Sequence, residues 1–147
     1  MSLQQPTQKM SKSHTDPRSR ILLTDAPDEI RRKVASALTD MTNSVSYDPT
    51  NRPGVSNLLQ LLSLFEDAGG KGPAELADEL AGANLKVLKT RVADAVVRGM
   101  EGVRDRYFDF LQRDGGKYLD DVQEGGAARA RENAGKTMEI VRSAVGL

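Results

Sequence analysis

The chain has 147 residues, a formal net charge of zero from 21 Lys and Arg against 21 Asp and Glu, and a sequence pI of about 6.6. This length suffices for one hydrophobic core, and the balanced charge gives no overall attraction to nucleic acid or membrane, so any anion recognition must be local. The absence of Cys excludes disulfides, thiolate nucleophiles and Cys-ligated zinc, and the single His excludes a His-rich metal site. With a mean hydropathy of −0.49 and no long uncharged apolar run, the chain is expected to be soluble, without a membrane span.

The predicted elements are helical from the first segment onward. All prolines lie at or before Pro73, so the first half should contain short helices separated by turns, while the second half can form long helices. Residues 1–24 are polar and are predicted to form a loop. An early proline and acidic residues then mark a helix start near residue 25, with opposed apolar and polar faces. The apolar face consists of Ile30, Val34, Leu38 and Met41, and the polar face of Arg31, Arg32, Lys33 and Asp40.

Two further helices are expected after the turn-forming residues 43–54. The first should open at Ser56 and carries leucines on most sides, which predicts burial between other helices. Gly69 to Pro73 should end it, before a short helix with three apolar positions. Those positions are Leu76, Ala77 and Leu80.

The second half is predicted to contain two long helices. The first carries a continuous apolar stripe that includes Tyr107, with Gly99 as a weak point. Gly115 and Gly116 should break it. The last helix has an Ala-rich stripe, which indicates close approach to another helix. Together with an almost complete lack of period-two alternation, these segments predict an all-α bundle of about four or five helices.

Familiar catalytic arrangements are not predicted. One His cannot supply a Ser–His–Asp triad, and the adjacent carboxylates Asp120 and Asp121 point to different sides of a helix. Arginines of the last two helices, with Glu132, are expected on solvated faces, a basic groove being the alternative. They are Arg98, Arg104, Arg106, Arg113, Arg129 and Arg131. Tyr107 and Phe108 can stack on a base, although the stripe predicts a packing role for Tyr107.

The unusual local feature is the pentapeptide Lys9-Met10-Ser11-Lys12-Ser13, with His14, Arg18 and Arg20 close behind. Ammonium groups three residues apart, with hydroxyls and backbone N–H groups between them, can surround a polyphosphate. On these grounds alone the alternatives are a disordered tail or the start of a mitochondrial transit peptide. The scarcity of apolar anchors before Ile21 counts against a transit peptide.

The same pentapeptide resembles the KMSKS signature of class I aminoacyl-tRNA synthetases, a mobile loop that closes over ATP during amino-acid activation. The residues that follow resemble the tryptophanyl-tRNA synthetases in order and spacing. These are Asp16-Pro17, Ile30 to Asp40, Tyr47-Asp48-Pro49 and Arg52-Pro53-Gly54-Val55-Ser56-Asn57-Leu58-Leu59. The resemblance is strong over residues 9–62 and thinner beyond, where 124–127 and 141–147 are similar to the family's last helix.

The resemblance implies roles for the pentapeptide. Lys9 and Lys12 would be catalytic, because they would neutralise the ATP phosphates as pyrophosphate leaves. Met10 and Ser11 would contact ATP, Ser13 would shape the loop, and Mg²⁺ would accompany the nucleotide as its counter-ion.

One departure from the family pattern follows the pentapeptide. His14 and Thr15 stand between the last Ser of the signature and Asp16, where family members commonly continue directly. His14 is expected to be a solvated insert rather than a catalytic base.

The resemblance further implies an ATP-closing loop at 1–24 and, at 25–147, the helical domain that receives the tRNA anticodon. The complete enzyme would be a homodimeric tryptophan–tRNA ligase that binds tRNA(Trp), tryptophan and ATP. Its nucleotide-binding α/β domain would precede the signature and is missing here, so the chain alone is expected to be inactive.

Residues 39–45 resemble the mitochondrial type, which favours the mitochondrial matrix over the cytoplasm. The alternative function is a non-catalytic helical module that binds RNA or another protein.

Overall fold

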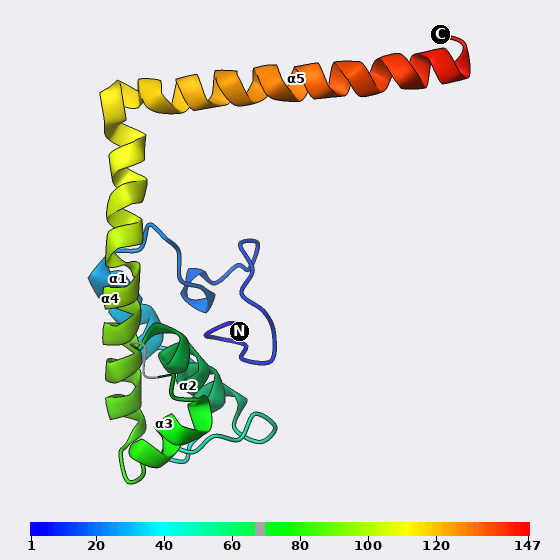
Figure 1. Cartoon of the computed structure of the whole chain (residues 1–147). Helices are drawn as coiled ribbons and strands as arrows, with labels where there is room; N and C mark the ends of the chain where they lie inside the picture. Colours follow the sequence, from blue (N-terminus) through cyan, green and yellow to red (C-terminus); the bar gives the residue numbers. More distant parts are fainter. Residues whose placement is uncertain (67–69) are drawn as a thin grey trace. The chain divides into compact units, whose positions relative to one another are not determined.

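The computed structural model describes residues 1–66 and 70–147, and its contacts divide the chain into two compact units, Met1–Arg104 and Asp105–Leu147. Regular structure in the described residues is helical throughout, with no strand, as the sequence predicts (Figure 1). No helix among them has the length and apolar character needed to cross a membrane. Gly69, predicted to help end the second helix, lies outside the described residues.

Unit 1 contains the short helices and the first part of a long one. After a 3₁₀ turn η1 (Pro17–Ser19) come α1 (Pro27–Ala35), α2 (Pro53–Phe65), α3 (Pro73–Glu79) and α4 (Leu85–Gln112). The first three α-helices each begin with proline, whose fixed φ suits the first helical position and whose missing N–H has no partner to lose there. The first 24 residues contain no α-helix, in agreement with the predicted loop.

The core of unit 1 gathers apolar side chains from all four helices and from the N-terminal segment. Its fully buried members are Leu3, Ile30, Val34, Val55, Leu58, Leu59, Leu62, Leu76, Leu88, Val92, Ala95 and Val96. Leu76, Ala77 and Leu80 are all buried, which confirms the short third helix. Because Leu3 is only 1% exposed, the residues that precede α1 pack firmly against the helices.

The first helix is shorter than its apolar pattern indicates. α1 ends at Ala35, and Leu38 and Met41 are 53% and 101% exposed, so their predicted place on its apolar face is wrong. The backbone N–H of Leu38 donates to the carbonyl of Leu3 at 2.7 Å, and Nζ of Lys89 donates to the carbonyl of Ala35 at 3.1 Å. These tertiary hydrogen bonds satisfy backbone groups that a longer helix would have used.

Lys33 was predicted on the solvent face of α1 and is instead buried. Its Nζ lies 2.6 Å from Oδ2 of Asp25, and the two side chains are 4% and 8% exposed. The same carboxylate accepts the backbone N–H of Leu22 at 2.8 Å. A buried ammonium persists only when it is paired and hydrogen-bonded, and the Asp25 carboxylate meets that requirement.

α2 begins at Pro53, three residues before the predicted start at Ser56. Residues 54–59 are all buried, so the first turns are covered on every side, as predicted, whereas Leu64 near the end of the helix is 79% exposed. The start is a close packing site: a Cβ on Gly54 would lie 2.2 Å from the carbonyl oxygen of Leu38. Glycine is therefore required where α2 meets the chain that leaves α1.

Gly99 of α4, predicted as a weak point, has a packing role. A Cβ there would lie 2.5 Å from Cδ1 of Phe65, so the ring of α2's last residue occupies the space that a side chain would fill. The α4 stripe is buried at Leu88, Val92 and Val96, as predicted.

Unit 2 contains the last turns of α4, the 3₁₀ turn η2 (Arg113–Gly116) and α5 (Lys117–Val145). Asp114, Gly115 and Gly116 have φ of 51°, 66° and 94°, which confirms the predicted break. Across it, the rings of Phe110 and Tyr118 stack at 5.4 Å, and the Arg113 guanidinium lies 4.8 Å and 4.9 Å from their centroids.

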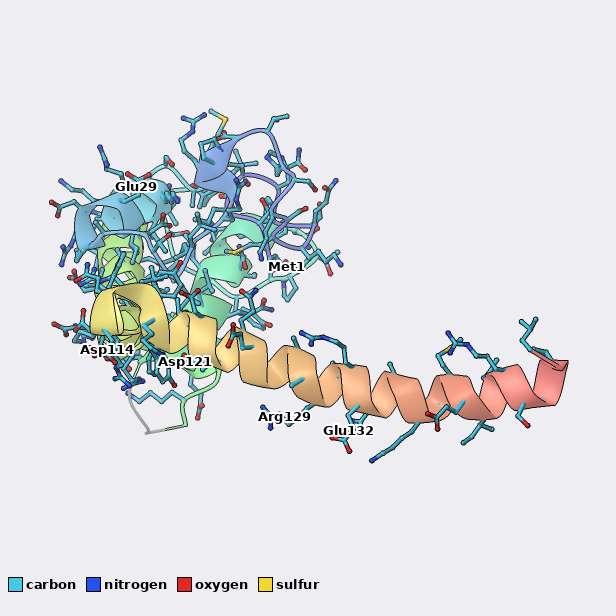
Figure 2. The ribbon with its side chains drawn as sticks, turned by 90° about the horizontal axis from the view of Figure 1, so that it is seen from above. Met1, Glu29, Asp114, Asp121, Arg129 and Glu132 are labelled. Atoms are coloured by element: carbon cyan, nitrogen blue, oxygen red, sulfur yellow. The ribbon has the colours of Figure 1, made fainter. Side chains whose placement is uncertain are left out.

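Side chains of α5 are exposed along its whole length. No residue of α5 is buried, so the predicted close approach of its Ala-rich stripe to another helix is not seen within unit 2. Tyr107 is 38% exposed and touches Phe108 edge-to-face, so its predicted core position is also wrong. Arg129 and Glu132 project outward from α5, as expected of a solvated face (Figure 2).

Candidate functional site

The pentapeptide 9–13 lies in unit 1, between residues 2–8 and η1. The side chains of Lys9 and Lys12 are exposed, and neither forms an ion pair with any described residue. Met10 is half-buried and packs against the core, which fixes the segment between the two lysines. The hydroxyls of Ser11 and Ser13 lie 2.9 Å apart and share a hydrogen bond. The arrangement presents two unpaired cations and two hydroxyls on a short stretch of surface.

The chain that leaves the pentapeptide is held by a local network. The Asp16 carboxylate accepts the backbone N–H of Arg18 at 2.8 Å. The Arg18 guanidinium also donates to it, from Nε to both oxygens at 3.1 Å and 3.2 Å and from Nη2 at 2.9 Å. The side-chain hydrogen bond from Arg18 lowers the pKa of Asp16 below its usual range, so this carboxylate is charged at neutral pH. The hydroxyl of Ser19 also donates to the carbonyl of Asp16 at 2.7 Å.

His14 belongs to this network rather than to a freely solvated insert. Its Nδ1 accepts the backbone N–H of Asp16 at 3.1 Å, and its carbonyl accepts Nη1 of Arg20 at 2.9 Å. The side chain is half-buried. The sequence pattern does not predict this role, because each of the two hydrogen bonds involves a backbone group, the N–H of Asp16 or the carbonyl of His14, and backbone groups leave no pattern in the residue types.

The chain that leads into the pentapeptide forms a closed turn, called here the N-terminal turn (residues 2–8). The backbone N–H of Ser2 donates to the carbonyl of Gln8 at 2.7 Å, which joins the two ends of the turn. Leu3 donates its N–H to the carbonyl of Ser19 at 2.9 Å, beyond the far end of the pentapeptide. Residues 9–13 are therefore anchored on both sides.

Arg52, the first residue of the motif 52–59, organises the loop between α1 and α2. Its guanidinium donates to both oxygens of Asp40 at 2.8 Å and 2.9 Å, and to the carbonyl of Thr42 at 2.9 Å. The side-chain hydrogen bond from Arg52 lowers the pKa of Asp40, against the smaller opposing effect of burial. Asp40, predicted on the polar face of α1, thus lies beyond that helix and fastens the loop to the start of α2.

Three surface cavities carry cationic side chains. One of about 370 Å³ lies beside α1, but its cations are paired: Arg18 with Asp16, Arg32 with Glu29 and Lys33 with Asp25. A second, of about 450 Å³, runs along α4 and includes Arg98, for which a solvated face is expected and a basic groove is the alternative. A third, of about 160 Å³, is lined by Arg31 and Lys89 among others. Arg106 and Arg113 belong to unit 2, where Arg113 pairs with Asp109.

Comparison with known proteins assigns the family. The model of the tRNA synthetases class I (W and Y) matches residues 1–99. Tryptophan–tRNA ligases of Listeria innocua and Enterococcus faecalis are 37% and 39% identical over all 147 residues. The chain spans 43% and 42% of the lengths of these relatives. A crystal structure of tryptophanyl-tRNA synthetase from Mycoplasma pneumoniae has the same fold, with a TM-score of 0.73 at 23% identity over the whole chain and 43% of that protein.

The relatives named here are bacterial, so they provide no support for the mitochondrial type that residues 39–45 suggest. The family match includes the pentapeptide 9–13, the Arg52 loop anchor and the first part of α4. The chain therefore belongs to the class I tRNA synthetases of the tryptophanyl and tyrosyl family.

Proposed function

We propose that this chain is part of a tryptophan–tRNA ligase, which uses ATP to activate tryptophan and transfers it to tRNA(Trp). Support comes from the family match over residues 1–99 and from relatives that are tryptophan–tRNA ligases. Because the chain spans 43% of the length of such a relative, the complete reaction is assigned to the whole enzyme. The contribution of this chain is the phosphate-directed segment 9–13 and the helices that follow.

The observation that carries the proposal is the pair of exposed lysines without ion-pair partners among the described residues. An ammonium already in place stabilises negative charge as it develops on a leaving pyrophosphate, and no reorganisation is then needed. Lys9 and Lys12 are assigned this catalytic role. Met10, Ser11 and Ser13 are assigned to ATP binding through backbone and hydroxyl groups, and Mg²⁺ would arrive with the nucleotide.

The helical remainder is assigned to tRNA. We infer that residues 1–24 form the ATP-closing loop and that 25–147 receive the anticodon region of tRNA(Trp), in an enzyme that is a homodimer when complete. The mitochondrial matrix is the proposed compartment, on the basis of residues 39–45, with the cytoplasm as the alternative. We expect no ATP–pyrophosphate exchange from this chain alone, because it spans 43% of the length of such a ligase.

Titration calorimetry with inorganic tripolyphosphate tests the role of segment 9–13 on the chain itself. Lys12→Ala should weaken binding by about 10- to 100-fold, since a charge-assisted contact contributes about 1.5–3 kcal/mol when it is well formed. The matched control is Lys86→Ala, which removes another exposed lysine of unit 1. Equal affinity of wild type and Lys12→Ala would refute the assignment.

A second experiment distinguishes the ligase from the alternative of a non-catalytic RNA-binding or protein-interaction module. Filter binding should show a preference for tRNA(Trp) over a random RNA of equal length. A module without a role in aminoacylation predicts equal retention of both RNAs, and equal retention would refute the tRNA assignment.

A further inference from the structure

Asn57 of α2 is a buried polar side chain, only 4% exposed, that contacts the start of the N-terminal turn. Its Nδ2 donates to the carbonyl of Ser2 at 3.2 Å and to that of Met1 at 3.4 Å. Because both facing groups are acceptors, the nitrogen and not the oxygen must point toward them. Its Oδ1 is buried and has no hydrogen-bond partner among the described residues.

A buried amide that satisfies only one of its two functions is unusual, since buried polar atoms generally find partners. Packing alone would favour an apolar side chain at this position, as at the neighbouring Leu58 and Leu59. What the amide adds is a fixed connection between α2 and the backbone of residues 1 and 2. The role of Asn57 is therefore to be sought in that backbone.

The connection leads directly to the pentapeptide. Ser2, held by Asn57 through its carbonyl, donates its N–H to Gln8, the residue immediately before Lys9. On the other side of the turn, Nε2 of Gln4 donates to the carbonyl of Ser36 at 3.0 Å. Asn57 thus fixes the start of the N-terminal turn to α2, and the hydrogen bond between Ser2 and Gln8 fixes the end of the turn to its start.

We propose that Asn57 is a positioning residue that sets where the pentapeptide leaves the helical unit, so that Lys9 and Lys12 reach the same polyphosphate. The inference rests on the proposed phosphate-directed function of segment 9–13. Asn57 itself contacts no phosphate. A variant without the Asn57 amide retains both lysines, but the N-terminal turn, and Lys9 with it, should be able to move relative to Lys12.

This mechanism predicts a ligand-dependent effect. Inorganic tripolyphosphate is long enough to contact both lysines at once and should lose affinity when their spacing varies. Orthophosphate engages one ammonium at a time and should lose little. General destabilisation of unit 1 would lower both affinities together. The ratio of the tripolyphosphate affinity to the orthophosphate affinity therefore distinguishes a loss of positioning from a loss of folding.

The experiment compares Asn57→Leu and Asn57→Asp with wild type by titration calorimetry, using inorganic tripolyphosphate and orthophosphate. Gln60→Leu is the matched control, because it removes a side-chain amide from the same helix whose partner is the hydroxyl of Tyr47, not the N-terminal turn. The Asn57 variants should bind tripolyphosphate about two- to tenfold more weakly, the size expected for one hydrogen bond. Orthophosphate binding and the effect of Gln60→Leu should stay within about twofold of wild type.

Amide hydrogen exchange provides a second readout. The N–H groups of Ser2 and Leu3 should exchange faster in the Asn57 variants, while those of Val92 and Val96 in the α4 core keep their wild-type rates. If the Asn57 variants do not fold, Gln4→Leu can be used instead, because it loosens the same turn from its exposed side. It should likewise lower the affinity for tripolyphosphate relative to the affinity for orthophosphate.

The outcomes separate this inference from the proposed function. If Lys12→Ala weakens tripolyphosphate binding while Asn57→Leu and Gln4→Leu behave like Gln60→Leu, the positioning role is wrong and the phosphate role stands. If Lys12→Ala has no effect, the phosphate role fails, and the positioning inference fails with it.

Discussion

Replacement of Lys33 by Met should destabilise unit 1, because it leaves the Asp25 carboxylate buried without its cation. Nζ of Lys33 lies 2.6 Å from Oδ2 of Asp25, and the side chains are 4% and 8% exposed. Removing one member of a buried ion pair costs about 3–5 kcal/mol, since the remaining charge keeps its desolvation penalty and loses its partner. Met has a similar length to Lys, so the cavity left behind adds little.

Two features of the site set the expected size within that range. The backbone N–H of Leu22 still donates to Asp25 at 2.8 Å, and this bond stabilises the carboxylate in the variant. Glu29 lies 4.0 Å from Nζ and loses a weaker contact. We expect the free energy of unfolding to fall by about 3 kcal/mol, the lower end of the range.

Urea unfolding followed by far-UV circular dichroism measures the effect. Lys71→Met is the control, because it breaks an exposed pair with Glu79 and should change the free energy of unfolding much less. The double variant Lys33→Met with Asp25→Asn should recover part of the loss, because no unpaired charge then remains buried. The reasoning is refuted if Lys33→Met costs no more than Lys71→Met, or if the double variant is less stable than the single one.

Two further predictions concern the motif 52–59 and the loop that it anchors. Gly54→Ala should destabilise the chain by about 1–3 kcal/mol despite the better helix propensity of Ala, because its Cβ would lie 2.2 Å from the Leu38 carbonyl oxygen. Gly125→Ala, with nothing within 4 Å, should instead raise helicity, and a Gly54→Ala protein that melts like wild type would contradict the packing argument. Arg52 lowers the pKa of Asp40 below its usual value of 3.8, so the carboxylate contributes stability above that pH and loses it as the pH falls through the lowered pKa. The difference in melting temperature between wild type and Asp40→Asn should therefore vanish on acidification, and a pH-independent difference would refute the ionic contribution.

The start of the first helix and the break between the two long helices were predictable because they depend on local backbone chemistry. Proline at 27 opens α1, and Gly115-Gly116 separates α4 from α5. Proline at 53 and 73 also opens a helix, although the sequence pattern assigned these residues to a turn and to a helix end. Each of these residues restricts or permits φ regardless of what surrounds it. The apolar stripe of α4 was read correctly at Leu88, Val92 and Val96 for a related reason, since its period matches one helical face.

The sequence-based predictions were wrong where contacts with another part of the chain decide the position of a residue. Leu38 follows the helical period, yet its backbone bonds to Leu3 and the helix ends before it. Lys33 is charged, which predicts a solvent-facing position, but its ammonium group is buried because it pairs with Asp25. Gly99 lowers the helix propensity of α4, but the ring of Phe65 fills the space that a side chain at this position would need.

In the candidate site too, some properties follow from the residue types and others only from the tertiary structure. The residue types of Lys9 to Ser13 by themselves indicated that this segment can attract anions, because ammonium groups and hydroxyls interact favourably with anions irrespective of fold. Its phosphate-directed role is a proposal that also rests on the family resemblance. Only the tertiary structure revealed that Asp16 and Arg20 hold one side of this segment and Asn57 the other. Charge and hydrogen-bonding capacity belong to a residue wherever it stands in the chain, whereas the partner that orients it is chosen by packing between segments far apart in sequence.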